Sequence, residues 1–175
     1  MQAPLIPDDE ASRLAVLRDL LILDTPAEDR LDIITQYATS VFEVPIALVS
    51  LVDENRQWFK SACGLDATQT SREISFCGHA ILSDHPLIVP DASQDFRFAD
   101  NPLVTGPPHI RFYMGAPIKI HHKNIGTLCL IDSIPHMVEE HHIQALQDLT
   151  KLVKEVILDK ALDAGAVALR LPKQS

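Results

Sequence analysis

A cysteine and a histidine lie close together in a segment whose composition could support chemistry. Cys77 and His79 are two residues apart in the segment SFCGHA, and a thiol beside an imidazole could act as an activated thiolate or a redox centre. On a helix, however, positions two apart point about 200° from each other, so the two side chains would not share a face. Because small free cysteines are commonly core residues, a buried and unreactive Cys77 is the favoured interpretation.

Arg111 and Tyr113 are separated by one residue in a segment with the alternation of a strand, so both should lie on one face of a sheet. A partly buried guanidinium must meet an anion or a carboxylate. Two interpretations remain open: the pair holds an anionic or polar ligand, or Arg111 pairs with Asp91 or Asp100 and ties a loop to the sheet. Buried charges are usually paired for structural reasons, which favours the second. The opposite face is expected in the core: Phe112, Met114, Ala116, Ile118 and Ile120.

The remaining chemistry-bearing residues do not form a known motif. The pairs His121-His122 and His141-His142 diverge on either a strand or a helix, so neither chelates a metal alone. Paired CxxC or HExxH spacings, P-loops and Gly-rich dinucleotide turns do not occur. Cys129 lies in the apolar segment LCL and is expected in the core. We therefore expect no metal, no catalytic residue and no enzymatic activity, and no cofactor is identified.

Composition restricts the class of protein. The chain has 175 residues, 46% of them hydrophobic, and a net charge of -9 from 15 Lys+Arg against 24 Asp+Glu. These values suit one globular domain and disfavour disorder and nucleic-acid binding, because an acidic molecule repels phosphates. Three irregularly spaced cysteines and an N-terminal segment unlike a signal peptide indicate a cytoplasmic protein. The longest apolar run, roughly residues 44–52, is too short to span a bilayer, so we expect no membrane association.

The hydrophobic pattern predicts the elements that position these residues. Helices are expected over residues 8–23, with Asp8 as cap, and over about 138–162. Thr25-Pro26-Ala27-Glu28 has the form of a capping box and predicts a further helix from Pro26 to about Phe42. Residues 44–52 are apolar on both faces, which is typical of a central strand, and residues 56–63 alternate as its hairpin partner. A second hairpin joins residues 110–121 to 124–131 through a turn at 122–124, where Asn124 tolerates a left-handed backbone.

The order of these elements predicts an α+β fold in which helices pack on an antiparallel sheet. If the terminal helices cover one face, the irregular middle segment from Ser75 to Ile110 must cover the other. Long loops in compact domains are usually binding loops or lids, so a ligand site is expected beneath this segment.

Six segments, in order, resemble those of GAF domains in bacterial signalling proteins. The resemblance extends from about Thr25 to Leu158 and includes LDTP at residues 23–26. It implies a central antiparallel sheet of five to six strands, terminal helices on one face, and a ligand cavity roofed by loops and short helices on the other. The six segments are IALVSLVD (46–53), RQWFKS (56–61), SFCGHAI (75–81), DA with RFADNPLV (91–104), IRFYMGAP (110–117) and GTLCLID (126–132).

The resemblance also implies a division of the chain and a set of candidate residues. Residues 25–160 would form the GAF domain, residues 1–24 an N-terminal helix at the dimer and signalling end, and residues 161–175 the end of the last helix and a tail. The signature of cyclic-nucleotide-binding GAF domains is absent, and Gly78 interrupts the adjacent Cys-His pair typical of bilin-binding relatives. The ligand is therefore unidentified. The candidate ligand-binding residues are Trp58, Phe76, Cys77, His79, Asp91, Phe98, Asn101, Arg111 and Tyr113.

We expect a sensory or regulatory domain that binds a small molecule and signals through its terminal helices, as a homodimer and with a signalling output domain or a kinase as partner. The dimer seam would comprise Ile143, Leu146, Thr150, Val153 and Ile157, with a neighbouring stripe of Leu149, Leu152 and Val156 and the first helix's Leu14, Leu17 and Leu21. An intramolecular helix pair could use the same stripes.

Two alternatives remain for the function. The first is a dimerisation module without ligand, whose cavity is filled by Trp58, Phe76, Phe98 or Tyr113. The second is thiol redox activity at Cys77 similar to that of methionine sulfoxide reductases. It is disfavoured because Arg111 stands where those enzymes carry a catalytic cysteine.

Overall fold

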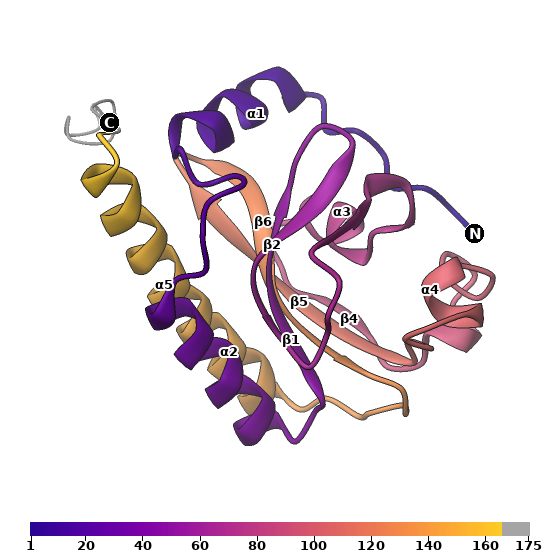
Figure 1. The fold of residues 1–175 in the computed structure, drawn as a ribbon. Coiled ribbons are helices and arrows are strands. Elements are labelled where there is room, and N and C mark those ends of the chain that lie inside the picture. Colours follow the sequence, from indigo (N-terminus) through magenta and orange to yellow (C-terminus); the bar gives the residue numbers. More distant parts are fainter. Residues whose placement is uncertain (166–175) are drawn as a thin grey trace.

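The centre of the protein is a six-stranded antiparallel sheet of order β3-β2-β1-β6-β5-β4, seen edge-on in Figure 1. This computed structural model describes residues 1–165. The predicted α+β class, with a sheet of five to six strands, is confirmed. The strands are β1 (Ile46–Val52), β2 (Arg56–Cys63), β3 (Gln69–Ser71), β4 (Leu87–Val89), β5 (Phe112–Ile120) and β6 (Lys123–Asp132).

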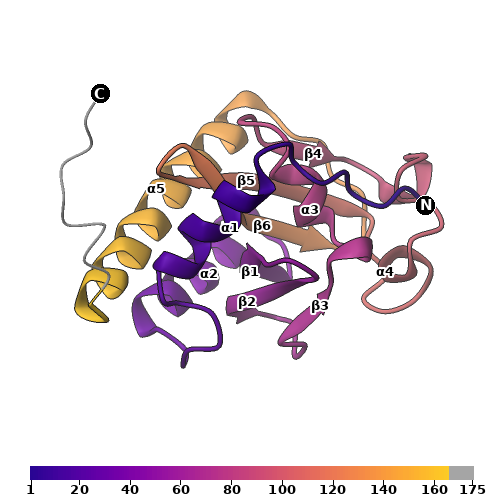
Figure 2. The same cartoon turned by 90° about the horizontal axis from the view of Figure 1, so that it is seen from above.

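Helices and loops cover both faces of the sheet (Figures 1 and 2). α2 (Asp29–Phe42) and α5 (Glu140–Asp163) pack side by side on one face, while α3 (Phe76–Ala80) and α4 (Pro102–Thr105) belong to the middle segment on the other. α1 (Glu10–Asp19) lies across one end of the sheet rather than on its face. Two short 3-10 turns complete the middle segment: η1 (Arg72–Ile74) and η2 (Ala92–Gln94).

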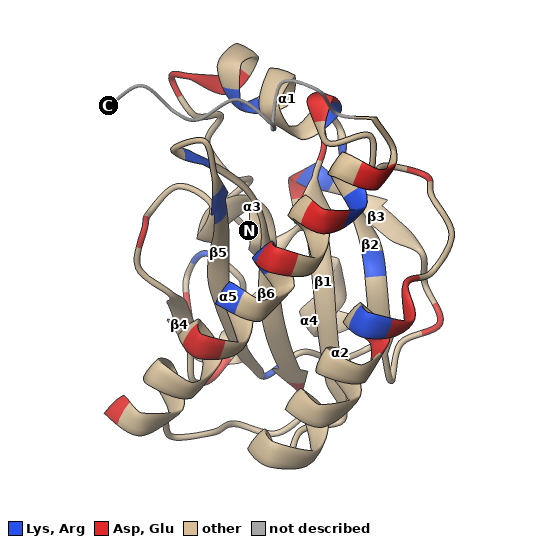
Figure 3. Ribbon diagram, turned by 90° about the vertical axis from the view of Figure 1, so that its left-hand side faces the viewer, with Lys and Arg blue, Asp and Glu red and all other residues tan. Residues whose placement is uncertain are grey.

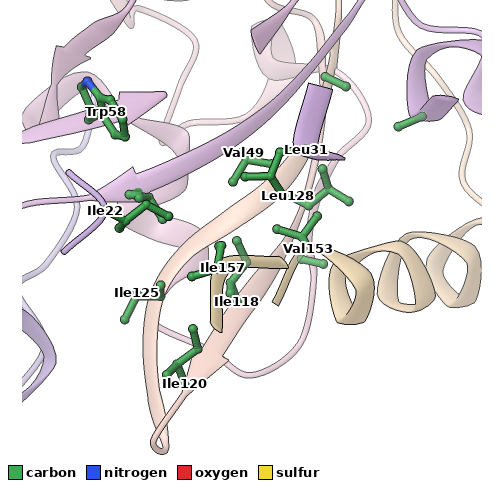
Figure 4. Packing of buried hydrophobic residues seen from close by; sticks show 14 of the residues in the cluster. Ile22, Leu31, Val49, Trp58, Ile118, Ile120, Ile125, Leu128, Val153 and Ile157 are labelled. Atoms are coloured by element: carbon green, nitrogen blue, oxygen red, sulfur yellow. The ribbon is translucent and has the colours of Figure 1, made fainter. Parts of the chain in front are cut away.

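The sheet separates two hydrophobic clusters. Figure 4 shows part of the larger one, in which Val49, Ile118 and Val153 pack between the sheet and the helices. The smaller one lies under the middle segment and includes Leu48 and Tyr113. All seven residues of β1 are buried, as its apolar character on both faces predicted. The predicted division of β5 is also confirmed, because Phe112, Met114, Ala116, Ile118 and Ile120 all belong to the helix-side cluster.

The N-terminal helices begin and end differently from the prediction. α2 begins at Asp29, so the capping box at Thr25 is wrong: its hydroxyl donates to the carbonyl of Ile22 (2.5 Å) and accepts from Lys60 Nζ (2.7 Å). Lys60 also donates to the Pro26 carbonyl, so this turn is held by a contact with β2 and not by a local helix cap. α1 ends at Asp19, since Leu21 has a left-handed backbone (φ 55°).

The turn between β5 and β6 also differs from the prediction. His121 and His122 carry the left-handed backbone angles (φ 50° and 63°), and β6 begins at Lys123. Asn124 is therefore a strand residue. Its amide donates to the carbonyls of Ile81 (3.0 Å) and Ser83 (3.2 Å), which fixes the segment after α3 against β6.

Most of the residues predicted to form a dimer seam are used by the fold itself, although Leu21 is exposed. Leu146, Thr150, Val153 and Ile157 of α5 are buried against the sheet, and Leu14 and Leu17 of α1 are buried in the same cluster. The apolar arc of α5 is wide because the helix packs against both the sheet and α2. Within α5, residues 140–163, Leu152 remains open to solvent, with 48% of its surface exposed.

Charged residues of both signs are interspersed over α1, α2 and α5 in Figure 3. Arg30 pairs with Asp159 (3.2 Å) and Lys160 with Glu28 (2.8 Å), which connects the start of α2 to the end of α5. The acidic residues of the N-terminal region therefore lie mostly on the solvent-exposed surface of the helices. Between residues 1 and 165, no helix is both long and apolar enough to cross a membrane.

Candidate functional site

A cavity of about 260 Å³ lies between the sheet and the middle segment, where the sequence placed the ligand site. Its floor is formed by side chains that alternate into this face from the central strands, and its roof by α3, α4 and the segment that follows α4. Most of the lining is apolar. The lining residues are Leu48, Gln57, Phe59, Leu65, Ala67, Thr70, Phe76, Cys77, Leu103, Pro107, Pro108, Ile110, Tyr113 and Ile131.

The short helix α3 directs Cys77 toward this cavity. Ser75 caps the helix, because its hydroxyl accepts from the Gly78 N–H (3.0 Å) and donates to the Arg72 carbonyl (2.7 Å). Cys77 is buried and lines the cavity, whereas His79 points outward. The prediction that the two side chains do not share a face is confirmed.

Three polar groups surround the Cys77 sulfur. The hydroxyls of Thr127 and Tyr113 donate to it at 3.1 Å and 3.3 Å, and the Cys129 sulfur lies 3.9 Å away. Burial by itself raises the pKa of the Cys77 thiol, but hydrogen bonds from Cys129, Thr127, Tyr113 and Ser50 outweigh burial and lower it. The pKa of Cys129 is raised, by its hydrogen bond with Cys77 and by burial. Cys77 is therefore the thiol of this pair that ionises first.

A polar edge continues from this sulfur along the sheet. Ser50 donates to the Gln57 side-chain oxygen (3.2 Å), and the Gln57 amide donates to the Thr70 hydroxyl (2.7 Å). Gln57 and Thr70 both line the cavity. The cavity thus has an apolar interior and one edge of uncharged hydrogen-bonding groups, an arrangement common in small-molecule sites.

Gly115 allows Tyr113 to reach Cys77. A β-carbon at residue 115 would fall well inside contact distance of the Tyr113 hydroxyl, and the Tyr113 ring is fully buried and has little room to move. The absence of a side chain at Gly115 therefore sets the position of the phenol.

Phe76, Cys77 and Tyr113 are the predicted site residues that line the cavity. Phe98 does not line the cavity. Its ring stacks on that of Phe76 in the roof, with ring centroids 4.1 Å apart. Trp58 was expected in the site but packs in the helix-side cluster, as Figure 4 shows. The reason is strand alternation: its neighbours Gln57 and Phe59 point into the cavity, so Trp58 must point away.

Three further predicted residues hold the middle segment together outside the lining. His79 Nε2 lies 2.9 Å from the Gln2 carbonyl, and burial lowers the pKa of this imidazole. Asp91 caps η2 by accepting from the Ser93 N–H (3.0 Å). Asn101 caps α4 and donates to the Ile74 carbonyl (3.0 Å). Each of these contacts is structural, and a ligand role for the three residues stays a prediction.

Arg111 matches neither interpretation of its charge. Its guanidinium donates to the carbonyls of Val104 and Ile110, both at 3.0 Å, and it lies outside the cavity lining. Asp91, one of its expected partners, instead accepts from Ser93, and Asp100 pairs with the N-terminal amine. Arg111 thus fixes the end of α4 through backbone carbonyls, which provide acceptors for its charge without a carboxylate.

Sequence reasoning missed several lining residues. Gln57 could have been found once Trp58 was assigned to the helix side, because adjacent strand residues point to opposite faces. Cys129 was correctly placed in the core, but its proximity to Cys77 depends on how α3 docks on β6, which no local pattern contains. Leu65, Leu103 and Pro108 come from loops and a short helix.

Within residues 1–165, no cluster of three or more His, Cys, Asp or Glu side chains could hold a metal ion.

The protein is a small α+β domain built around an internal site. Its antiparallel sheet has helices on one face and a roofed, mostly apolar cavity on the other. Residues 26–157 match the GAF domain family, and the chain belongs to that family.

The chain is similar to a curated bacterial enzyme and to solved structures of this fold. The chain is 44% identical over 155 residues to a cyclic di-GMP phosphodiesterase of Pseudomonas aeruginosa; the match covers 87% of the chain and 26% of that relative, so the chain spans about a quarter of its length. The GAF domain of a phosphoenolpyruvate-protein phosphotransferase from Coxiella burnetii superposes with a TM-score of 0.64 at 15% identity, covering 88% of this chain and 98% of that one.

A free methionine-R-sulfoxide reductase from Neisseria meningitidis, solved in complex with its substrate, superposes with a TM-score of 0.63 at 16% identity, covering 94% of this chain and 99% of that one. At such identity the likeness of these two structures shows a shared fold alone.

Proposed function

We propose that this domain is a non-enzymatic sensor in cytoplasmic signalling, which binds a small and mostly apolar molecule and transmits its presence through the terminal helices. The observation that carries the proposal is the cavity of about 260 Å³ under the middle segment. Drug-sized ligands occupy pockets of roughly 300–1,000 Å³, so the occupant should be smaller than these.

The lining indicates the chemistry of the occupant. No Asp, Glu, His, Lys or Arg side chain lines the described cavity, and its hydrogen-bonding groups are the amide of Gln57, the hydroxyls of Thr70 and Tyr113, and the sulfur of Cys77, whose pKa is lowered. A charged ligand would lose its hydration here without an opposite charge in return, which is costly. We therefore expect a neutral molecule with one or two polar groups that face this edge.

The ligand-free alternative receives less support. It requires the cavity to be filled by Trp58, Phe76, Phe98 or Tyr113, but Trp58 and Phe98 lie outside the lining, and a cavity remains beside the other two. A module that served only dimerisation would have no need to keep this space open.

Two routes connect the cavity to the helices. β1 directs Leu48 into the cavity, while its neighbours Ala47 and Val49 pack on the helix side, so one strand contacts both layers. In the second route, Glu10 of α1 accepts from Arg72 (2.5 Å), which precedes α3 in the roof. Transmission requires that the ligand bind two arrangements of these elements with different affinity.

The surface for a partner chain is proposed on the outer sides of α2 and α5. Ile33, Tyr37 and Val41 repeat every four residues on α2 and are exposed, as is Leu152 on α5. We propose that a homodimer forms through these exposed residues, and not through the seam predicted from the sequence, whose residues are mostly buried within the fold. Because the match covers only 26% of the related phosphodiesterase, we propose that the domain acts on an output domain of such a protein or on a separate signalling enzyme.

The proposal is tested by mass spectrometry of small molecules released when freshly purified protein is denatured. Leu103→Trp places a large side chain in the lining and should abolish release, whereas Leu82→Trp, at an exposed residue beyond α3, should not. Release of the same compound from both variants, or of none from the wild type, would contradict the proposal.

A further inference from the structure

Two of the three cysteines meet in the core although they are 52 residues apart in sequence. Cys77 from α3 and Cys129 from β6 are both buried, and their sulfur atoms are 3.9 Å apart. Cys63, on β2, lies apart from them, with its sulfur 3.8 Å from the Thr39 hydroxyl of α2. The proposed binding function uses Cys77 as one polar group of the lining and gives Cys129 no role.

We propose that Cys77 is a site of oxidation by small organic hydroperoxides that enter the cavity, and that Cys129 converts the oxidised product to a reversible disulfide. The proposal shares the cavity with the sensor function but requires no resident ligand.

The position of each sulfur assigns the two roles. Cys77 lines the cavity and Cys129 does not, so a molecule in the cavity meets Cys77 first. The hydroxyls of Thr127 and Tyr113 both donate to the Cys77 sulfur, and such donors stabilise a thiolate, which is the nucleophilic form of cysteine. The Cys129 sulfur lies 3.9 Å from the Cys77 sulfur, close enough for Cys129 to act as the resolving thiol after a local movement.

The oxidant class follows from the lining. Apolar side chains such as Leu48, Phe59 and Ile131 form most of the wall, so an alkyl or aryl hydroperoxide is favoured over hydrogen peroxide. Apart from the reacting Cys77 sulfur, no acidic or basic side chain lines the described cavity, so an uncharged hydroperoxide is favoured over a charged one.

The proposed chemistry has two balanced steps. The Cys77 thiolate attacks the terminal oxygen of ROOH; the S–O bond forms, the O–O bond breaks, and the leaving alkoxide takes a proton to give ROH, leaving Cys77 as a sulfenic acid. The Cys129 thiol then attacks the Cys77 sulfur; the S–S bond forms, the S–O bond breaks, and hydroxide leaves and combines with the thiol proton as water. Two electrons pass from the thiols to the hydroperoxide.

Disulfide formation requires a local movement. An S–S bond is about 2.05 Å long, so the two sulfurs must approach by roughly half of their present separation. Cys77 belongs to a helix of five residues in the roof, whereas Cys129 belongs to a central strand. The disulfide would therefore tie the roof of the cavity to the sheet.

The test uses the reduced wild-type chain and cumene hydroperoxide as the probe. After anaerobic treatment with the probe, the protein is denatured, free thiols are alkylated and counted, and linked peptides are mapped by mass spectrometry. We expect the count to fall from three to one, with Cys77 linked to Cys129, full recovery after dithiothreitol, and a slower reaction with hydrogen peroxide at equal concentration.

Matched variants separate the roles of the three cysteines. Cys63→Ser should lose two thiols as the wild type does, and Cys129→Ser should leave Cys77 as a sulfenic acid that dimedone traps. The thermal unfolding midpoint of each variant establishes that it is folded. Retention of three thiols in the wild type, a link through Cys63, or faster reaction with hydrogen peroxide would overturn the proposal, and none of these outcomes would alter the ligand-release result.

Discussion

A buried ion-pair cluster attaches α1 to the roof of the cavity, and its removal should destabilise the domain strongly. The Glu10 carboxylate accepts from Arg13 (2.9 Å) and from Arg72 (2.5 Å). The side chains of Arg13 and Arg72 are only 2% and 5% exposed, and that of Glu10 is 17% exposed. Glu10→Gln keeps the size of the side chain but leaves two buried guanidinium groups without their carboxylate.

The size of the effect follows from burial. Breaking a buried ion pair by removing one partner costs about 3–5 kcal/mol. Because the Gln carbonyl still accepts a hydrogen bond and residue 10 is partly hydrated, we expect a loss of about 2–3 kcal/mol in the free energy of unfolding. Urea denaturation at pH 7 measures it, and with a slope of about 2–3 kcal/mol/M the midpoint should fall by about 1 M.

The effect should depend on pH with a definite sign. Burial alone would raise the pKa of Glu10, but hydrogen bonds from Arg13 and Arg72 outweigh it and lower the pKa from 4.5 to about 2. A carboxyl group whose pKa is lower in the folded than in the unfolded protein stabilises the fold. This stabilisation is complete above the pKa of the unfolded state and is lost as the pH falls through the pKa of the folded state. The difference between wild type and Glu10→Gln should therefore be constant above pH 4.5 and shrink between pH 4.5 and about 2.

Glu54→Gln is the matched control, because it breaks a solvent-exposed ion pair of the same chemical kind. Arg18 and Glu54 lie 3.3 Å apart, and their side chains are 56% and 63% exposed. Such pairs contribute about 0–1 kcal/mol, so the midpoint should hardly move. Equal losses in the two variants, or a pH-independent difference for Glu10→Gln, would refute the role assigned to burial.

Three further variants test the geometry of the cavity. Gly115→Ala should cost about 1–3 kcal/mol in urea denaturation, because the new methyl group displaces the buried Tyr113 phenol. Tyr113→Phe should raise the pKa of Cys77, measured from the pH dependence of its alkylation rate, since one donor to the thiolate is lost; an unchanged pH profile would contradict this. Trp58→Phe should lower stability by about 1–3 kcal/mol and leave ligand release unchanged, because residue 58 faces the helices.

Much of the fold could be predicted from local patterns. A run that is apolar on both faces identifies a central strand, so β1 was placed correctly, and alternation divided β5 into a core face and a cavity face. The cavity's position followed from the need to cover the second face. The capping box at Thr25 failed because a tertiary donor, Lys60, engages the same hydroxyl.

The details of the site depend on contacts that no local pattern contains. Arg111 was expected to need an anion, yet two backbone carbonyls of the roof satisfy it. Trp58 was among the candidate ligand-binding residues, but its neighbours Gln57 and Phe59 line the cavity, so strand alternation directs Trp58 away from it. Cys129 meets Cys77 only because α3 docks on β6, and this contact between distant segments decides the chemistry of the pair.

The central claim, that the cavity of this GAF domain binds a small neutral molecule, is tested most directly by native mass spectrometry of the folded chain after equilibration with a low-molecular-weight cell extract. We predict one discrete mass increment for the wild type, which disappears on denaturation and in Leu103→Trp but persists in Leu82→Trp. A wild-type protein that retains the mass of its polypeptide alone, or an increment that Leu103→Trp leaves intact, would contradict the account.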